Sequence, residues 1–153
     1  MTDAYTSKDL IQLEDYNGKW TLSNFADGTI AELAVPNESS TVTTGYNGNS
    51  LGAHNEPGRQ RRATLRLVKG SDDDKRINET FQLWQDRDPR FRPFKGWFTK
   101  NIGHSDGSLS QDTTECYFGL PGNNVTMMQD TTGNTEQCVS VYTITFGNSK
   151  RNV

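Results

Sequence analysis

The chain has little of what most enzymes and metal proteins use in their sites. Its 153 residues include two histidines and two cysteines, and only 31% of them are apolar. Two thiols make neither a disulfide framework nor a zinc cage, so we expect Cys116 and Cys138 to be small buried hydrophobes, with a bridge between them as the minor alternative. His54 and His104 each lie in a Gly/Asn/Ser-rich segment without a second ligand at metal-binding spacing. We therefore expect no metal and no cofactor.

Long apolar runs and a surplus of basic charge are also missing. Nowhere do about 18 apolar residues follow one another, as a membrane-spanning helix requires. Sixteen Lys and Arg against nineteen Asp and Glu leave a net charge of -3, which gives no overall attraction to phosphates or anionic membranes. The first residues, Met1 to Ala4, carry no basic leader followed by an apolar run. We expect a protein that is soluble and cytosolic when made, has no membrane partner and is no general nucleic-acid binder.

Catalytic motifs are sparse as well. His104 to Ser108 contains His, Ser and Asp, the residue types of a hydrolase triad, but triad members come from separate elements. No nucleophile-elbow pattern surrounds either serine. Gly45 to Gly48 lacks both the lysine and the following helix of a phosphate-binding loop. The three carboxylates Asp72 to Asp74 are explained by the start of a helix. The sequence predicts that the protein is not an enzyme.

Alternation of apolar and polar residues is the main pattern that is present. Leu10 to Asp15 alternates, and the Tyr16-Asn17-Gly18-Lys19 turn that follows is typical of a hairpin, because Asn and Gly tolerate positive φ. Thr29 to Val35 places Ala31 and Leu33 on one face and Glu32 on the other. Similar stretches occur at residues 40–44, 62–68, 114–120, 124–129 and 137–146. We predict roughly seven or eight strands in one domain, 1–153.

One helix is expected, over about residues 71–86. Ser71 can cap its first turn, where Asp72 to Asp74 favour the positive end of the helix dipole. Ile77, Phe81 and Trp84 recur at i, i+4 and i+7, which predicts an aromatic stripe that packs against a sheet. The fold class is therefore mainly β, a β-sandwich or half-barrel with one flanking α-helix.

Two polar stretches interrupt this pattern. Gly45 to Gln60 holds four glycines, three asparagines and one proline, and we interpret it as a long loop with Arg59, Arg61 and Arg62 as a basic stem at its far end. Asn101 to Ser110 is predicted to be a second loop. A chain with so small an apolar fraction can gain stability from neighbouring subunits, so we expect assembly, with a loop-rich monomer as the alternative.

The first half of the sequence resembles a known family. Tyr5-Thr6-Ser7-Lys8-Asp9 leads a strand, Leu22 to Leu33 reads LSNFADGTIAEL, and a basic alternating strand and a capped helix follow. This order resembles the tail tube proteins of contractile-tailed (myovirus-type) bacteriophages. The chain differs in having Asn24 where that family more usually has glycine before the phenylalanine, and its second half matches only in architecture.

The resemblance implies a structural virion protein of the phage tail, synthesised in the host bacterial cytoplasm. Its subunits would self-assemble into hexameric rings whose inner sheets join as one barrel, and the rings would stack into an inner tail tube. The tail sheath, the baseplate and the tape-measure protein would be its partners. Genomic DNA would pass through during ejection without specific binding, because carboxylates that face the lumen repel phosphates.

Candidate residues follow from the resemblance together with the strand pattern. Glu14 and Glu32 are expected to face the lumen, since Glu32 lies opposite the apolar face of its strand. The long loop and its stem are expected to insert into the adjacent ring and pair with acidic residues there. The residues of this inter-ring contact are Gly45, Tyr46, Asn47, Gly48, Asn49, Arg59, Arg61 and Arg62.

Other readings stay open. A glycan-binding β-sandwich could use Trp20 and Trp97 as a stacking platform, which requires one of them to face solvent. Another ring-forming tail component, such as a tube initiator or terminator, fits the same pattern. The aromatic and basic stretch Phe91 to Lys100 could stack bases in a single-strand binder, although packing aromatics with a basic rim between subunits fit the negative net charge better.

Overall fold

The computed structural model describes residues 2–5, 9–25, 31–54, 56–122, 126–128 and 139–152. These residues form eleven strands, one α-helix and one short 3-10 helix. In chain order the elements are β1 (Thr2–Tyr5), β2 (Leu10–Asp15), β3 (Gly18–Thr21), β4 (Ala31–Ala34), β5 (Ser40–Thr44), β6 (Ser50–His54), η1 (Glu56–Arg59), β7 (Arg61–Val68), α1 (Asp72–Gln85), β8 (Phe94–Gly103), β9 (Leu109–Pro121), β10 (Thr126–Met128) and β11 (Val139–Asn152).

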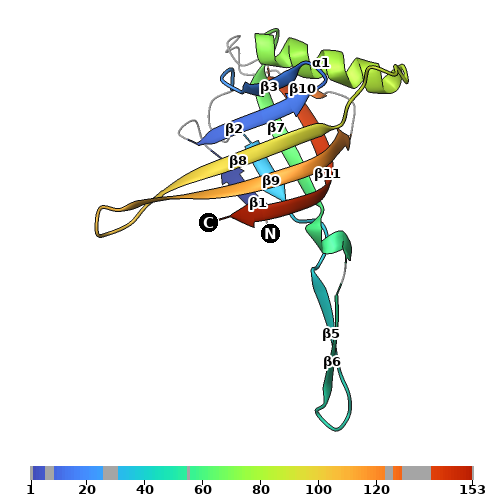
Figure 1. The fold of residues 1–153 in the computed structure, drawn as a ribbon, viewed down its shortest axis with the longest axis vertical. Coiled ribbons are helices and arrows are strands. Elements are labelled where there is room, and N and C mark those ends of the chain that lie inside the picture. Colours follow the sequence, from blue (N-terminus) through green and yellow to red (C-terminus); the bar gives the residue numbers. More distant parts are fainter. Residues whose placement is uncertain are drawn as a thin grey trace.

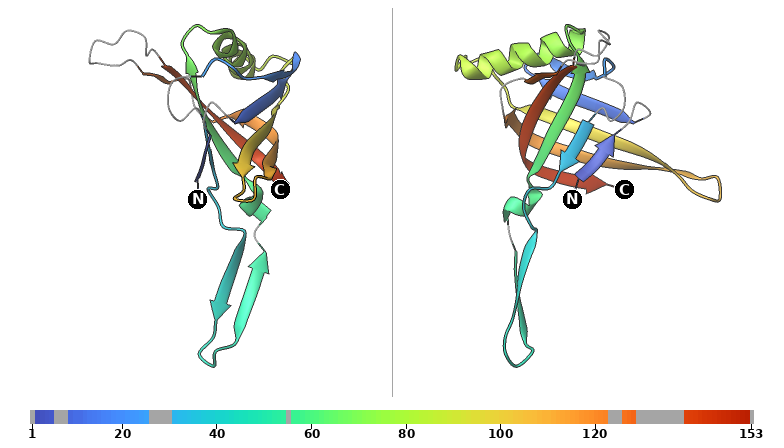
Figure 2. Two further views of the ribbon diagram at one scale, coloured as in Figure 1. Left: turned by 90° about the vertical axis from the view of Figure 1, so that its left-hand side faces the viewer. Right: turned by 180° about the vertical axis from the view of Figure 1, so that it is seen from behind.

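Nine of the strands form one antiparallel sheet. Its order is β1-β4-β7-β11-β9-β8-β2-β3, and β10 pairs with β11 beside this path. The sheet curls so that its two halves face each other (Figure 1). We call β2, β3, β8 and β9 the front wall, and β1, β4, β7, β10 and the first half of β11 the back wall; the back wall is nearer the viewer in the right panel of Figure 2. The sheet is a half-barrel that does not close on itself, as the sequence predicts.

The core lies between the two walls. Alternate residues point inward, so that Leu13 of the front wall and Leu65 of the back wall are fully buried. The Tyr5 ring of the back wall packs on Phe98 of the front wall with centroids 5.7 Å apart. Gly119 leaves room for Phe146, since a Cβ at this glycine would lie 2.6 Å from the Phe146 ring. The tight fit of these rings holds the walls together.

Helix α1 closes one end of this sandwich (Figure 1). Its N-cap is Ser71, whose Oγ accepts a hydrogen bond from the Asp74 N–H at 3.3 Å. The Phe81 ring contacts Phe94 of the front wall and Tyr142 of the back wall, with centroid separations of 6.0 and 5.1 Å. The expected helix is therefore confirmed, and it bridges both walls.

Buried carboxylates fix the helix on the sheet. Asp73 accepts hydrogen bonds from the backbone N–H of Ser23 at 2.8 Å and of Asn24 at 3.0 Å, and from the Trp20 indole at 3.2 Å. Asp74 accepts from the Gly70 N–H at 2.8 Å and from the Tyr142 hydroxyl. Burial, and then the hydrogen bond to Asp74, raise the pKa of Tyr142. The first-turn aspartates thus do more than favour the helix dipole, because two of them are structural hydrogen-bond acceptors.

Several local predictions are wrong, each for a tertiary reason. Trp84 is 43% exposed and stacks on Phe91, while Leu83 takes the buried position of the helix, because α1 extends past the edge of the sheet beneath it. The expected loop at Asn101 to Ser110 is shorter than predicted and spans only residues 104–108, since β8 runs to Gly103 and β9 starts at Leu109. In the first hairpin only Gly18 has a positive φ, and the Asp15 carboxylate supports the turn by accepting from the Asn17 N–H. The sequence Ala26-Asp27-Gly28 also predicts a second tight turn, and these residues lie outside the described ones.

The hydrogen bonds of Asp73 lead to a stability prediction. We expect Asp73→Ala to lower the free energy of unfolding by about 2–3 kcal/mol, because four donors, including the Asn24 side-chain amide, lose a charged acceptor in a buried place. Asp72→Ala, in the same helical turn but exposed, serves as the control and should cost about 0.5 kcal/mol through the helix dipole alone. Urea unfolding followed by circular dichroism measures both values. Equal losses in the two variants would contradict the role assigned to Asp73.

Candidate assembly surfaces

The β5–β6 hairpin projects away from the body of the protein. It extends along the longest axis in all three views (Figures 1 and 2). All ten of its strand residues are exposed, including Val42 and Leu51. No lysine, arginine, aspartate or glutamate occurs between residues 39 and 55. A two-stranded hairpin is marginally stable in water on its own, which makes this exposed, uncharged arm a candidate surface for assembly.

The tip of the arm is a short turn made of the residues expected in the inter-ring loop. The Gly45 N–H donates to the Asn49 carbonyl at 2.7 Å, and the Gly48 N–H donates to the Gly45 carbonyl at 3.0 Å. Gly48 has a φ of 80°, which favours glycine. Tyr46 is fully exposed at this tip. The prediction of one long loop over Gly45 to Gln60 is therefore wrong, because β6 and η1 occupy most of that stretch.

The base of the arm is packed tightly and uses part of the basic stem. A Cβ at Gly58 would lie 2.4 Å from the Ser39 backbone, so the chain crosses itself there. The Arg61 guanidinium donates to the carbonyls of Gly58 and Gln60, at 3.3 and 3.1 Å. The Arg59 carbonyl accepts from the Ser149 hydroxyl at 2.8 Å. Of the three arginines expected in the stem, Arg61 thus makes local bonds that hold the base of the hairpin.

The two glutamates expected in a lumen lie on different walls. Glu14 points outward from the front wall, where the strand register places it opposite Lys19 and Lys95. Glu32 points outward from the back wall and is exposed, opposite Thr64 of β7. The exposed Arg62 and the half-buried Arg66 flank Thr64 on the same face of β7. A channel lined by one wall would therefore contain Glu14 or Glu32, not both.

Strand edges form a second kind of candidate surface. Within the described residues, β1 pairs with β4 alone and β10 pairs with β11 alone, so each presents one side to solvent or to a partner. The opposite end of the sheet, β3, is better covered, because the Trp20 indole on it bonds Asp73 of α1. Unpaired edges are templates for pairing with another strand. The back wall therefore has an edge available on each side.

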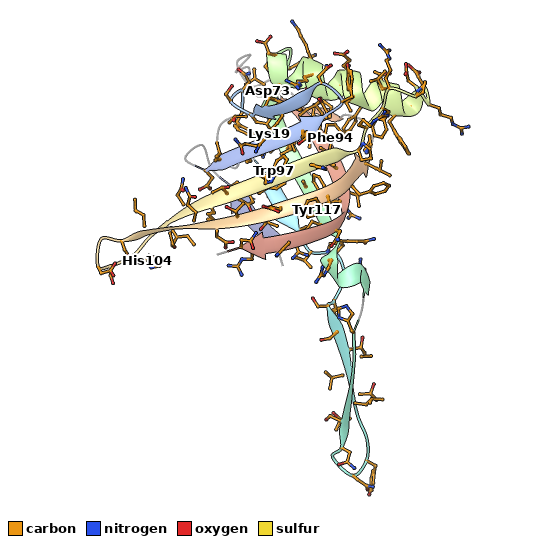
Figure 3. The ribbon with its side chains drawn as sticks, viewed as in Figure 1. Lys19, Asp73, Phe94, Trp97, His104 and Tyr117 are labelled. Atoms are coloured by element: carbon orange, nitrogen blue, oxygen red, sulfur yellow. The ribbon has the colours of Figure 1, made fainter. Side chains whose placement is uncertain are left out.

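The two tryptophans proposed as a glycan platform are covered by cations. The Arg76 guanidinium stacks 3.9 Å from the Trp20 ring centre, and the Lys19 ammonium sits 4.1 Å from that of Trp97. Both side chains are half-buried. Figure 3 shows Lys19 and Trp97 together on the front wall. Neither ring offers the solvent-facing surface on which a sugar could stack, which argues against the lectin alternative.

The residues that suggested chemistry do not form a catalytic group. The His104 Nε2 lies 2.9 Å from the Ser110 hydroxyl, but Asp106 bonds Ser108 and not the histidine. Burial raises the pKa of the Cys116 thiol to about 12, which leaves it unreactive; Cys138 lies outside the described residues. The described ranges hold no group of three or more His, Cys, Asp or Glu placed to bind a metal ion. Their helix also falls short of the length and apolar character needed to cross a membrane.

A groove at the end of α1 was not expected from the sequence. It has a volume of about 670 Å³ and is lined mainly by Leu83, Trp84, Arg87, Asp88, Pro89 and Phe91. The helical period alone predicted Trp84 to be buried. The signal available in the sequence was Pro89, which ends the helix and turns the chain back so that Phe91 meets Trp84.

Comparison with solved structures defines the class of fold. The chain is similar to one in the cryo-EM structure of the anti-feeding prophage cap, the AFP tube terminating cap, with a TM-score of 0.59 and 12% identity over 99% of this chain and 91% of that chain. A chain of the AFP baseplate gives 0.55 and 11% over 99% and 97%. One in the sheath-tube complex of the extracellular contractile injection system PVC gives 0.54 and 9% over 94% and 88%. This is therefore a fold found in contractile injection systems.

Sequence comparison adds nothing to this result. No family model matches the chain, and no significant match to a curated protein was found.

The exposed arm leads to a prediction about hydrogen exchange. In dilute, unassembled protein, backbone amides of residues 41–44 and 50–53 should exchange much faster than those of residues 141–145 in β11, because every strand residue of the arm is exposed, whereas β11 alternates with buried residues in the main sheet. Exchange followed by mass spectrometry measures this. Equal protection in a confirmed monomer would mean that the hairpin is stable by itself.

Proposed function

We propose that this chain is a non-enzymatic, ring-forming subunit of a contractile tail, and that its rings form the inner tail tube. The observation that carries the proposal is the fold, which is shared over 94–99% of the chain with chains from tube cap, baseplate and sheath-tube structures. The arm and the strand edges supply the contacts that such an assembly needs.

Ring closure follows from the back wall. In the proposed ring the β10 edge of one subunit pairs with the β1 edge of the next, so that the back walls join into a continuous barrel. A closed barrel leaves no edge strand exposed. A head-to-tail contact of this kind gives a closed ring when its rotation is a whole fraction of a turn, and we propose six subunits.

Stacking follows from the arm. The hairpin of each subunit reaches into the adjacent ring, where its apolar side chains lose the solvent exposure they have in the single subunit. An exposed patch with this much Val, Leu and Tyr character marks an interaction site. The uncharged strands suit a contact between protein surfaces and would not hold a nucleic acid.

The lumen is proposed to be lined by the outward face of the back wall, with Glu32 on it. In this proposal DNA passes through without specific binding, because Glu32 offsets part of the positive charge of the neighbouring Arg62 and Arg66 on that face. The sheath, the baseplate and a tape-measure protein are the proposed partners in the particle. The chain is made in the bacterial cytoplasm and ends in the virion.

A tube terminator or initiator is the second candidate. The specific observation in its favour is the similarity to a chain from the AFP tube terminating cap structure. A terminator would form single rings, whereas a tube subunit would form long stacks. The two roles are therefore separated by the same experiment.

Electron microscopy of the purified chain, alone and with its baseplate partners, tests the proposal. We expect rings and stacked tubes for the natural chain. Deletion of Gly45 to Asn49 with a two-residue connection should leave rings that no longer stack, because the tip of the arm is lost. Protein that stays monomeric at high concentration would refute the ring, and tubes of normal length after the deletion would refute the role of the arm.

Charge reversal tests the lumen assignment. Glu32→Lys should leave assembly intact but slow DNA ejection, because the face then carries cations without a carboxylate. Glu14→Lys on the front wall is the matched control and should eject at the natural rate. Ejection kinetics of the assembled particles measure the effect. Normal kinetics for Glu32→Lys, or equal slowing by both variants, would remove Glu32 from the lumen.

A further inference from the structure

The groove at the end of α1 has the chemistry of a site for an uncharged aromatic side chain. The Trp84 and Phe91 rings lie with their centroids 5.1 Å apart on its surface. Of its two charged lining residues, Asp88 is matched within the chain, because its carboxylate pairs with Arg90 at 3.0 Å. The second charged residue of the groove lining, Arg87, is exposed to solvent. An aromatic guest would meet aromatic faces and one guanidinium.

The groove and the tip of the arm lie at opposite ends of the molecule. Along the longest axis, α1 and the segment that follows it are at one end and the turn between β5 and β6 is at the other (Figure 1). Both side views in Figure 2 show the same separation. A second copy displaced along this axis therefore brings its tip toward the α1 end of the first copy.

We propose that the groove receives the Tyr46 tip of a second copy of this chain in the adjacent ring. This inference rests on the proposed stacking of rings, and it adds the receiving surface for the arm. Tyr46 is the most exposed of the large apolar and aromatic side chains in the described residues, and no charge on the arm opposes its burial.

The contact is chemically matched. A tyrosine ring packs on Trp84 and Phe91 by edge or offset stacking, and the Arg87 guanidinium can lie over its face. The groove volume of about 670 Å³ exceeds what one ring fills, so Asn47 and Asn49 of the same turn also fit beside it. Their amides can bond the polar rim.

The β8–β9 hairpin, which exposes Leu109, fits the groove less well than the β5–β6 hairpin does. Leu109 lies at the tip end of the β8–β9 hairpin, which extends to the side of the body and across the longest axis (Figure 1). Asp106 and Asp112 on this arm carry charge, unlike the β5–β6 hairpin. Its direction suits a neighbour beside the subunit and not one above or below it.

Cross-linking tests the contact directly. Asn47→Cys places a thiol beside the tip residue Tyr46, and Gln85→Cys places one on the groove lining beside Trp84. Cys138→Ser removes one natural thiol, while the buried Cys116 stays unreactive. A short bismaleimide should then give a ladder of dimers, trimers and longer covalent chains, because each subunit donates one tip and offers one groove. The pairs Asn47→Cys with Lys95→Cys and Leu109→Cys with Gln85→Cys are the controls and should give no ladder.

Two single substitutions give an independent readout. Tyr46→Ala and Trp84→Ala should each lower the fraction of stacked rings about ten-fold or more, as loss of a central aromatic anchor does, while single rings persist. Tyr46→Phe should stack normally, because the ring and not the hydroxyl fills the groove. Circular dichroism confirms that each variant is folded.

The outcomes separate this inference from the proposed function. Stacked tubes without a ladder, or with an equal ladder from a control pair, would overturn the groove contact and leave the tube role standing. Stacking that survives Trp84→Ala would do the same. Failure to form any ring or stack under all conditions would overturn both.

Discussion

The packing of aromatic rings between two walls of one curled sheet is the interaction on which the rest of this structure depends. Phe98 contacts Tyr5 across the core and Phe146 beside it, and Phe81 closes the end against Phe94 and Tyr142. Because these large rings fill the space between the two walls, a chain with a modest apolar fraction can still fold. Gly119 is part of the same fit, since any side chain there would displace the Phe146 ring.

The polar parts of the molecule are arranged around that core in two ways. Near α1, charged groups are used internally: Asp15 holds Arg76 and Thr80, and Asp73 holds the segment after β3. Away from the core, the β5–β6 hairpin and the back-wall edges have hydrogen-bonding or apolar surface without a partner inside the described subunit. The first arrangement stabilises the monomer, and the second favours association, since a partner that binds only the folded chain stabilises it. In the proposed function, this association takes the form of a ring that stacks.

The comparison with sequence-based expectation is instructive at the helix. Ser71 and the aspartates after it predicted the start of α1 correctly, because capping depends on residues within one turn. The period predicted Ile77 and Phe81 as core, which is confirmed, but failed at Trp84. A helical period predicts which face of the helix is apolar, but it does not predict where the sheet that packs against this face ends. The same limit applies to Glu14 and Glu32, whose outward direction follows from alternation although the curl of the sheet decides that they point from different walls.

The amino-acid sequence by itself determined the class of fold, the first hairpin, the basic β7 strand and the position of the helix, because each depends on neighbours within a few residues. Only the tertiary structure decided that residues 50–54 pair with residues 40–44 as a free arm, that Arg61 holds the base of that arm, and that Trp84 and Phe91 border a groove. These features depend on which surfaces remain after the core has formed. Glycine, asparagine and serine are equally compatible with a loop and with an exposed strand, so composition could not distinguish them.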